Sequence, residues 1–157
     1  MRLMLVTAFG LGLCKPGPGT WGSILPLVVA GVGGHWCPDV VTLVMGVLAV
    51  LASVLCVQLT PWAEARFGRH DASEIVIDEV AGMALALAIV FAVPAAMTHL
   101  TWAMAAAFVL FRVLDIAKPG PINALQRCAG GWGVLLDDLA AGLLAGAIVA
   151  GGLLLAG

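Results

Sequence analysis

Two pairs of adjacent acidic residues stand where apolar stretches begin, and these residue types can do chemistry. Asp78 and Glu79 open one stretch, and Asp137 and Asp138 open another. A charged side chain at the centre of a bilayer costs at least about 2.5 kcal/mol, so acids entering an apolar span need a partner or a function. Carboxylate oxygens are ligands that Mg²⁺ prefers. The pairs therefore predict a cation site, with two solvated helix starts as the alternative.

Two further acids precede the first pair. A helix from about Asp71 would place Asp71, Glu74 and Asp78 at i, i+3 and i+7, on one face. Like charges so close resist ionising together unless they share a cation. A solvated helix start explains Asp71 and Glu74 well, because acids favour the positive end of the helix dipole, but it explains Asp78 and Glu79 poorly, because they enter the apolar stretch.

Two regions could bind an anion. In the first, Arg112 and Asp115 are three residues apart and can pair on one helix face, and Lys118 follows one turn later. Snorkelling cations at the end of a membrane helix need no function, however. In the second, glycines surround Lys15, and Thr20 and Ser23 could donate hydrogen bonds from a helix start. No Gly-Lys-Ser/Thr follows, so this is not a Walker A loop, and a flexible turn is its alternative.

These clusters fit one kind of chemistry when they are taken together. Mg²⁺ and basic side chains clamp a phosphoryl group while its charge redistributes during transfer. A site at the bilayer surface indicates that the phosphate is carried by a lipid.

The elements that must position these residues are apolar helices, since 62% of the 157 residues are hydrophobic and only 10% are charged. Spans of about 20 residues are expected at residues 40–60, 75–96, 100–116 and 135–157. Residues 21–36 give only about 24 Å of helix, so they form either a short span or a re-entrant arm. We expect an all-α, polytopic membrane protein with about four full spans plus this short helix, in a single membrane-embedded domain over residues 1–157. Small residues recur every four positions at Gly82 and Ala86 and at Gly142, Gly146 and Ala150, which predicts close helix packing.

The distribution of charge predicts the orientation. If residues 21–36 cross the bilayer, all seven Lys and Arg residues share one side, which the positive-inside rule makes cytoplasmic together with the N-terminus. Residues 1–13 are expected to be a short interfacial or partly embedded element rather than a removed signal. A net charge of −2 without a basic run argues against nucleic acid as a partner. The four cysteines form no CxxC pair, which argues against a zinc site.

Three segments resemble the phosphatidylglycerophosphatase A family. They are residues 10–23 with Pro18-Gly19-Thr20-Trp21-Gly22-Ser23, residues 70–82 with Ile75-Val76-Ile77-Asp78-Glu79, and residues 111–121 continued by 130–142 with Asp137-Asp138. Gly17 stands where the family more often has Ala, and Ile77 where Trp is frequent. The resemblance implies a Mg²⁺-dependent phosphatase in the bacterial inner membrane. Its cytoplasm-facing site would convert the phospholipid phosphatidylglycerophosphate to phosphatidylglycerol and inorganic phosphate.

The resulting hypothesis gives each cluster a role. One or two Mg²⁺ ions are held by carboxylates (Asp71, Asp78, Glu79, Asp137 and Asp138), and Asp115 either orients Arg112 or adds a ligand. Phosphate is bound by Lys15, Arg112 and Lys118, assisted by Thr20 and Ser23. Water activated by the ion attacks phosphorus in line, while an Asp nucleophile stays open. His70 relays a proton to the leaving alkoxide or is simply a surface residue.

Other classes of protein would require different sequence features. A cation channel or transporter would need acids throughout the bilayer depth, whereas here they crowd one edge. A non-catalytic assembly subunit would leave the paired acids replaceable. A CDP-alcohol phosphotransferase would need a longer Asp-rich helix, beginning Asp-Gly and continuing through Ala-Arg, that the sequence lacks. The oligomeric state is open, including a homo-oligomer.

Overall fold

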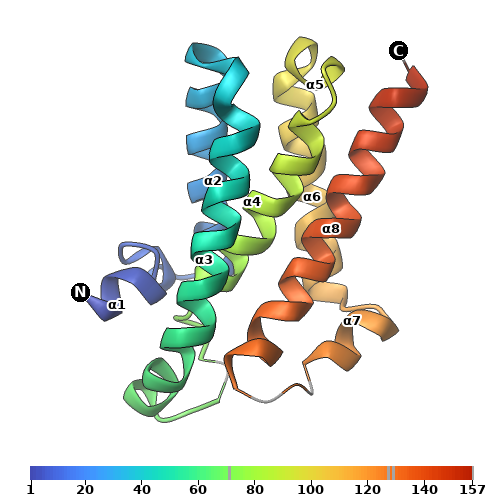
Figure 1. The fold of residues 1–157 in the computed structure, drawn as a ribbon. Coiled ribbons are helices and arrows are strands. Elements are labelled where there is room, and N and C mark those ends of the chain that lie inside the picture. Colours follow the sequence, from blue (N-terminus) through green and yellow to red (C-terminus); the bar gives the residue numbers. More distant parts are fainter. Residues whose placement is uncertain (71, 127, 129, 157) are drawn as a thin grey trace.

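Every regular element in the described part of the chain is helical, which confirms the all-α class. The computed structural model describes residues 1–70, 72–126, 128 and 130–156. In chain order the elements are α1 (Arg2–Val6), the 3₁₀ turn η1 (Leu11–Leu13), α2 (Pro18–Trp36), α3 (Pro38–Phe67), α4 (Ile77–Phe91), α5 (Ala95–Thr98), α6 (Leu100–Ala117), α7 (Gly120–Leu125) and α8 (Gly131–Ala156). The long helices form a bundle, with α1 and α7 beside its lower half in Figure 1.

Three of the helices in the described residues are long and apolar enough to cross a membrane: α3, α6 and α8. Their outer faces carry exposed apolar side chains such as Leu43, Val109 and Leu144, which suits contact with lipid. The short segment predicted at residues 21–36 lies within one continuous helix of 19 residues, α2.

The span expected over residues 75–96 is not one continuous helix. Its helix, α4, has only 15 residues and ends at Phe91, and a separate short helix, α5, begins after Pro94. Proline lacks an N–H and disfavours a helical residue before it, which accounts for the interruption. At 1.5 Å per residue α4 is about 22 Å long.

The predicted helix from Asp71 onward is also wrong. Residues 72–76 are not helical, and α4 begins only at Ile77. The backbone N–H of Val76 donates instead to the carbonyl of Val6, at 2.9 Å. This bond joins the loop before α4 to the N-terminal element.

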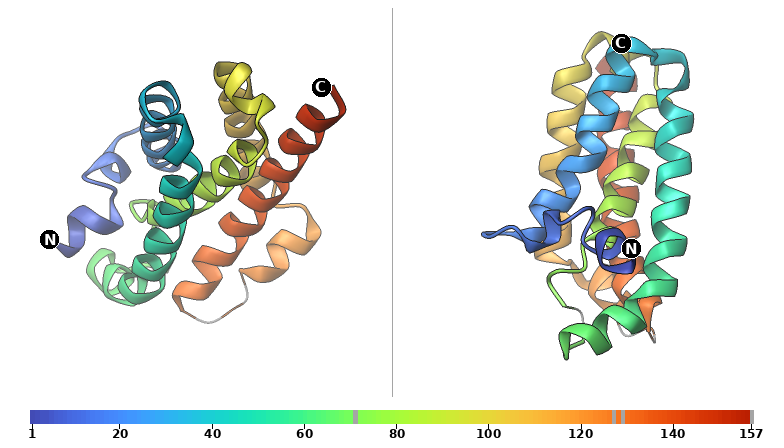
Figure 2. Two further views of the ribbon diagram at one scale, coloured as in Figure 1. Left: turned by 45° about the horizontal axis from the view of Figure 1, so that its top comes forward. Right: turned by 90° about the vertical axis from the view of Figure 1, so that its left-hand side faces the viewer.

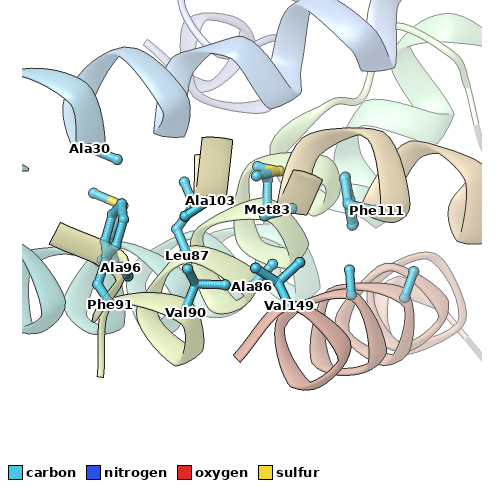
Figure 3. Packing of buried hydrophobic residues seen from close by; sticks show 14 of the residues in the cluster. Ala30, Met83, Ala86, Leu87, Val90, Phe91, Ala96, Ala103, Phe111 and Val149 are labelled. Atoms are coloured by element: carbon cyan, nitrogen blue, oxygen red, sulfur yellow. The ribbon is translucent and has the colours of Figure 1, made fainter. Parts of the chain in front are cut away.

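The core of the bundle surrounds α4, which packs against α2, α3, α6 and α8 (Figure 2). Met83, Leu87 and Val90 of α4 are fully buried. Figure 3 shows them among Phe111 of α6 and Val149 of α8. Because α4 is enclosed by other helices, its side chains face protein and can include polar groups.

The closest helix contact joins α4 to α8, where the sequence predicted small residues. A Cβ atom on Gly142 would overlap the carbonyl of Gly82, and one on Gly146 would lie 2.9 Å from the carbonyl oxygen of Ala86. Glycine removes this obstacle and lets the two backbones touch. The first turns of α4 and α8, which carry the acidic pairs, are thereby held together.

Candidate active site

Four helix ends meet in the lower half of the bundle in Figure 1. They are the N-terminal ends of α2, α4 and α8 and the C-terminal end of α6. The N-terminal end of a helix carries partial positive charge, which favours carboxylates and phosphate groups. This arrangement brings together residues that lie far apart in the sequence.

Three carboxylates form the centre of this region, namely Asp78 and Glu79 from α4 and Asp138 from α8. One oxygen atom from each lies within 4.8 Å of the others. Asp78 and Asp138 are only 6% and 4% exposed. Within the described residues, Glu79 Oε2 and Asp138 Oδ2 are buried without a hydrogen-bond partner. Carboxylates that lie so close together and are buried or half-buried fit a hard cation, so this cluster could hold a metal ion, as predicted for these three residues.

Arg112 and Asp115 pair next to the three carboxylates, as their spacing predicted. Arg112 Nη1 donates to Asp115 Oδ2 at 2.6 Å, and the two side chains are 16% and 10% exposed. Asp115 also lies within hydrogen-bonding reach of Asp138. Among the described residues, therefore, Asp115 orients Arg112 and also borders the acidic cluster.

Gly19, in the first turn of α2, lies against Glu79 and Arg112. A Cβ atom here would overlap the Glu79 carboxylate and would lie 3.2 Å from Arg112 Nη1. The missing side chain thus makes room for one acidic and one basic group at a helix N-terminus. Any larger residue at this position would displace them.

Lys118 lies at the end of α6 and pairs with the second acid of α8. Its Nζ donates to Asp137 Oδ2 at 2.5 Å, and Gln126 Nε2 donates to the same oxygen at 2.8 Å. Burial alone would lower the pKa of Lys118, but the Asp137 hydrogen bond and the nearby carboxylates of Asp137, Asp138 and Asp115 raise it overall. Lys118 is therefore a firmly charged cation beside the acidic cluster.

The glycine-rich segment before α2 contributes less directly than expected. Ser23 is fully buried, and its hydroxyl donates to the carbonyl of Gly19 at 2.8 Å. Thr20 is half-buried in the first turn of α2. Lys15 is exposed on the preceding turn, where its charge acts on Glu74. These three positions lie at the end of the bundle that carries the site, but the structure assigns Ser23 to helix packing.

His70 and Asp71 are the remaining predicted site residues. The side chain of His70 is 68% exposed, and its Nε2 is 3.5 Å from Glu64 Oε1. It lines a cavity of about 250 Å³ with Gln126, Gly133 and Val134. Asp71 lies outside the described residues, so its predicted role as a metal ligand stays a prediction.

Known proteins share this sequence over almost its whole length. A family model for phosphatidylglycerophosphatase A matches residues 4–153. The chain belongs to the phosphatidylglycerophosphatase A family. The resemblance found in the motifs is thus confirmed, and the chain is an enzyme of a phosphatase family.

Individual relatives carry two different names. Proteins named phosphatidylglycerophosphatase A from Haemophilus influenzae and Escherichia coli are 36% and 34% identical; each alignment covers 93% of this chain, and 85% and 80% of the relatives. A putative phosphatidylinositol-3-phosphatase from Bacteroides thetaiotaomicron is 32% identical over 96% of this chain and 92% of its own length. No solved structure matches the chain.

Two residues of the site were missed by the sequence analysis. Gly19 was noted only as part of a glycine-rich segment, although its contact with Glu79 and Arg112 is what makes its size matter. Gln126 was not singled out at all, because one glutamine in a connecting segment forms no pattern. Its hydrogen bond to Asp137 becomes visible only in three dimensions.

Proposed function

We propose that the protein hydrolyses the terminal phosphate of phosphatidylglycerophosphate, giving phosphatidylglycerol and inorganic phosphate, with Mg²⁺ as cofactor. One observation carries the proposal: three carboxylates, two buried and one half-buried, have oxygens within 4.8 Å of one another beside Arg112 and Lys118, in a chain of the phosphatidylglycerophosphatase A family. Metal-binding acids next to phosphate-binding cations are the parts that phosphoryl transfer requires.

In this proposal Asp78, Glu79 and Asp138 hold one or two Mg²⁺ ions, with Asp71 as a further ligand. The unpaired buried oxygen atoms of Glu79 and Asp138 support this assignment. When bound, Mg²⁺ supplies charge stabilisation to the phosphoryl group and activates water. Asp137 Oδ2 accepts hydrogen bonds from Lys118 and Gln126, whereas its Oδ1 is buried without a hydrogen-bond partner among the described residues. Asp137 therefore stays in the proposed set of ligands, through Oδ1.

Arg112 and Lys118 bind the oxygens of the substrate phosphate. Arg112 offers a planar fork of donors, and Asp115 fixes its orientation. The first turn of α2, with Gly19 and Thr20, adds the positive end of a helix dipole. Lys15 is exposed near Glu74, where it can attract anionic lipid before binding.

In the reaction, a water oxygen forms a bond to phosphorus while the bond between phosphorus and the glycerol oxygen breaks. The proton released by the water returns to the leaving alkoxide. His70 is proposed for this proton relay. Attack by an Asp carboxylate, followed by hydrolysis of the phosphoenzyme, is the alternative route.

The site faces the cytoplasm from the bacterial inner membrane in this proposal. The basic residues Lys15, Arg112 and Lys118 lie at the end of the bundle that carries the site, and the positive-inside rule places that end in the cytoplasm. In this orientation α2 also crosses the bilayer, so that α2, α3, α4, α6 and α8 form the membrane domain.

The expected substrate carries its phosphate as a monoester on glycerol. The relative named as a putative phosphatidylinositol-3-phosphatase suggests a competing substrate with a phosphate monoester on inositol. Both would place a phosphate at the same cations. The names of the two other relatives favour the glycerol ester.

A cation channel with an acidic mouth is the alternative function. A channel requires polar groups through the depth of the bilayer. The described core of α4 beyond its first turn is instead apolar, with Met83, Leu87 and Val90 fully buried. This packing favours the enzyme.

The decisive experiment uses the purified protein in detergent micelles. Phosphate release is measured from phosphatidylglycerophosphate, phosphatidylinositol 3-phosphate and glycerol 3-phosphate, each with Mg²⁺ and with a chelator. We expect rapid release from the first lipid with Mg²⁺ and none with the chelator. Preference for the inositol lipid would overturn the substrate assignment, activity in the chelator would overturn the metal assignment, and inactivity on all three would refute the function.

A further inference from the structure

Asp137 has a different environment from that of the neighbouring acid in the sequence. Asp138 faces Asp78 and Glu79, whereas Asp137 Oδ2 accepts hydrogen bonds from Lys118 and Gln126. The Asp137 side chain is only 3% exposed. A buried carboxylate that accepts two donors on one oxygen is fixed in orientation, since any rotation would break both bonds.

Lys118 depends on such a partner more than an ordinary lysine does. Its backbone is left-handed, with φ of +40°, which is unfavourable for a residue with a side chain. Its Nζ also lies among the charges of Asp137, Asp138 and Asp115. An unusual backbone at a functional position requires surrounding contacts that hold it, and Asp137 provides the one contact described for Nζ.

Gln126 is itself held in place against the first turn of α8. A Cβ atom on Gly133 would lie 2.8 Å from the carbonyl oxygen of Gln126 and would overlap that of Cys128. The backbone at Gln126 therefore touches α8 one turn before Asp137. The side-chain amide of Gln126 therefore donates to Asp137 from a backbone that is held by packing against α8.

We propose that Gln126 is a positioning residue, which fixes the Asp137 carboxylate and thereby holds Lys118 Nζ where it binds the substrate phosphate. This inference rests on the proposed function for the identity of the substrate. In this inference, Asp137 Oδ2 holds the Lys118 ammonium group in place. Through Oδ2, Asp137 then has a role that Asp138 lacks, although the two acids are adjacent in the sequence.

The test compares three variants. Gln126→Met keeps the length of the side chain but removes the donor, and Gln126→Glu replaces the donor with a group that repels Asp137. Gln58→Met is the matched control, because Gln58 is the other glutamine of the chain and is exposed on α3. For each, kcat and KM are measured on phosphatidylglycerophosphate, and inorganic phosphate is titrated in a calorimeter with Mg²⁺ present.

We expect Gln126→Met to raise KM and the Kd for phosphate about tenfold, the usual effect of losing a hydrogen bond to a charged group. The kcat should stay within about twofold, because the metal-binding carboxylates keep their places. Gln126→Glu should bind phosphate still more weakly than Gln126→Met. Gln58→Met should match the wild type in KM, kcat and the Kd for phosphate. A purely structural role would lower kcat and the melting temperature and would leave KM unchanged, so that pattern would overturn the proposal.

A double-mutant cycle with Lys118→Met completes the test. If Gln126 acts through Lys118, Gln126→Met should weaken phosphate binding no further in the Lys118→Met background. If the double variant instead loses phosphate affinity by the product of the two single-variant factors, the proposal is refuted. If Gln126→Met does not fold, Gln126→Asn serves in its place, since it shortens the amide's reach by one CH₂ group. Phosphate affinity is measured without turnover, so a wild type inactive on the lipid would refute the substrate and leave this comparison decisive.

Discussion

Gly82 of α4 and Gly142 of α8 face each other with no room for a side chain between them. A Cβ atom on Gly142 would overlap the carbonyl of Gly82, whereas one on Gly151 of the same helix would meet nothing within 4 Å. Gly142→Ala should therefore push α8 away from α4 at a cost of about 1–3 kcal/mol. Its melting temperature in detergent should fall by about 5 °C.

Gly151→Ala is the matched control, because it adds the same methyl group to α8 where space is open. Its melting temperature should equal or exceed that of the wild type, since alanine favours helix. Equal melting temperatures for both variants would contradict the close contact described here.

The metal-binding role proposed for the buried acids predicts large losses of activity. Asp78→Asn and Asp138→Asn each remove a charge from the candidate cluster while they retain the side-chain size. Hydrolysis should fall at least about 100-fold, as when a main electrostatic contact is lost in other enzymes. Asp39→Asn changes an exposed acid at the start of α3 and should retain wild-type rates. Full activity in either buried variant would reject the assignment.

Arg112 should not be replaceable by lysine. Lysine keeps the charge but loses the planar fork that donates to Asp115 and that is proposed to donate to phosphate. Arg112→Lys should lower kcat/KM about tenfold or more. The same change at Arg66, which is exposed near the end of α3, should have no effect. Equal kinetics for the two lysine variants would show that the fork is not used.

Glu74 should make the stability of the protein depend on acid pH. A hydrogen bond from Arg69 holds the pKa of Glu74 below its ordinary value of 4.5, so the unfolded chain takes up the proton first. The stabilisation is therefore complete above pH 4.5 and is lost as the pH falls through the lower folded-state pKa. Glu74→Gln should melt about 2 °C below the wild type at pH 7, since an exposed ion pair is weak. This difference should vanish at low pH; a difference that persists there would exclude the ion pair as its cause.

The native cysteines can report the topology. Cys14 and Cys37 lie at the two ends of α2 and are exposed, as is Cys128, whereas Cys56 is buried. In single-cysteine variants, a membrane-impermeant maleimide should label Cys37 in intact spheroplasts. It should label Cys14 and Cys128 only after the membrane is opened, and Cys56 only after denaturation. Labelling of Cys14 and Cys37 from the same side would show that α2 does not cross.

The apolar helices could be predicted from hydropathy, but their ends could not. Residues 40–60 were expected to span the bilayer, yet α3 continues to Phe67 and ends where Gly68 adopts a left-handed backbone. A helix persists beyond its apolar part until a capping residue stops it. Conversely, α4 is shorter than the apolar stretch around it because Pro94 interrupts that stretch.

The acidic pairs could be predicted as neighbours in space, but their separate partners could not. Adjacent residues on a helix point about 100° apart, so Asp137 and Asp138 cannot have the same surroundings. Which one joins Asp78 depends on how α8 is rotated, and that rotation is set by the packing of Gly142 on Gly82. Glu74 was predicted to share a face with Asp78, but Arg69, five residues earlier, binds it instead.

The enclosed position of α4 has a consequence for how the chain enters the membrane. With 15 residues and two acids in its first turn, this helix is too short and too polar to settle alone among lipid chains. The ribosome delivers it after α2 and α3 but before α6 and α8, which later cover its remaining sides. We therefore expect α4 to wait beside the translocation channel until its neighbours emerge, so that insertion of this protein is completed only with its last helix.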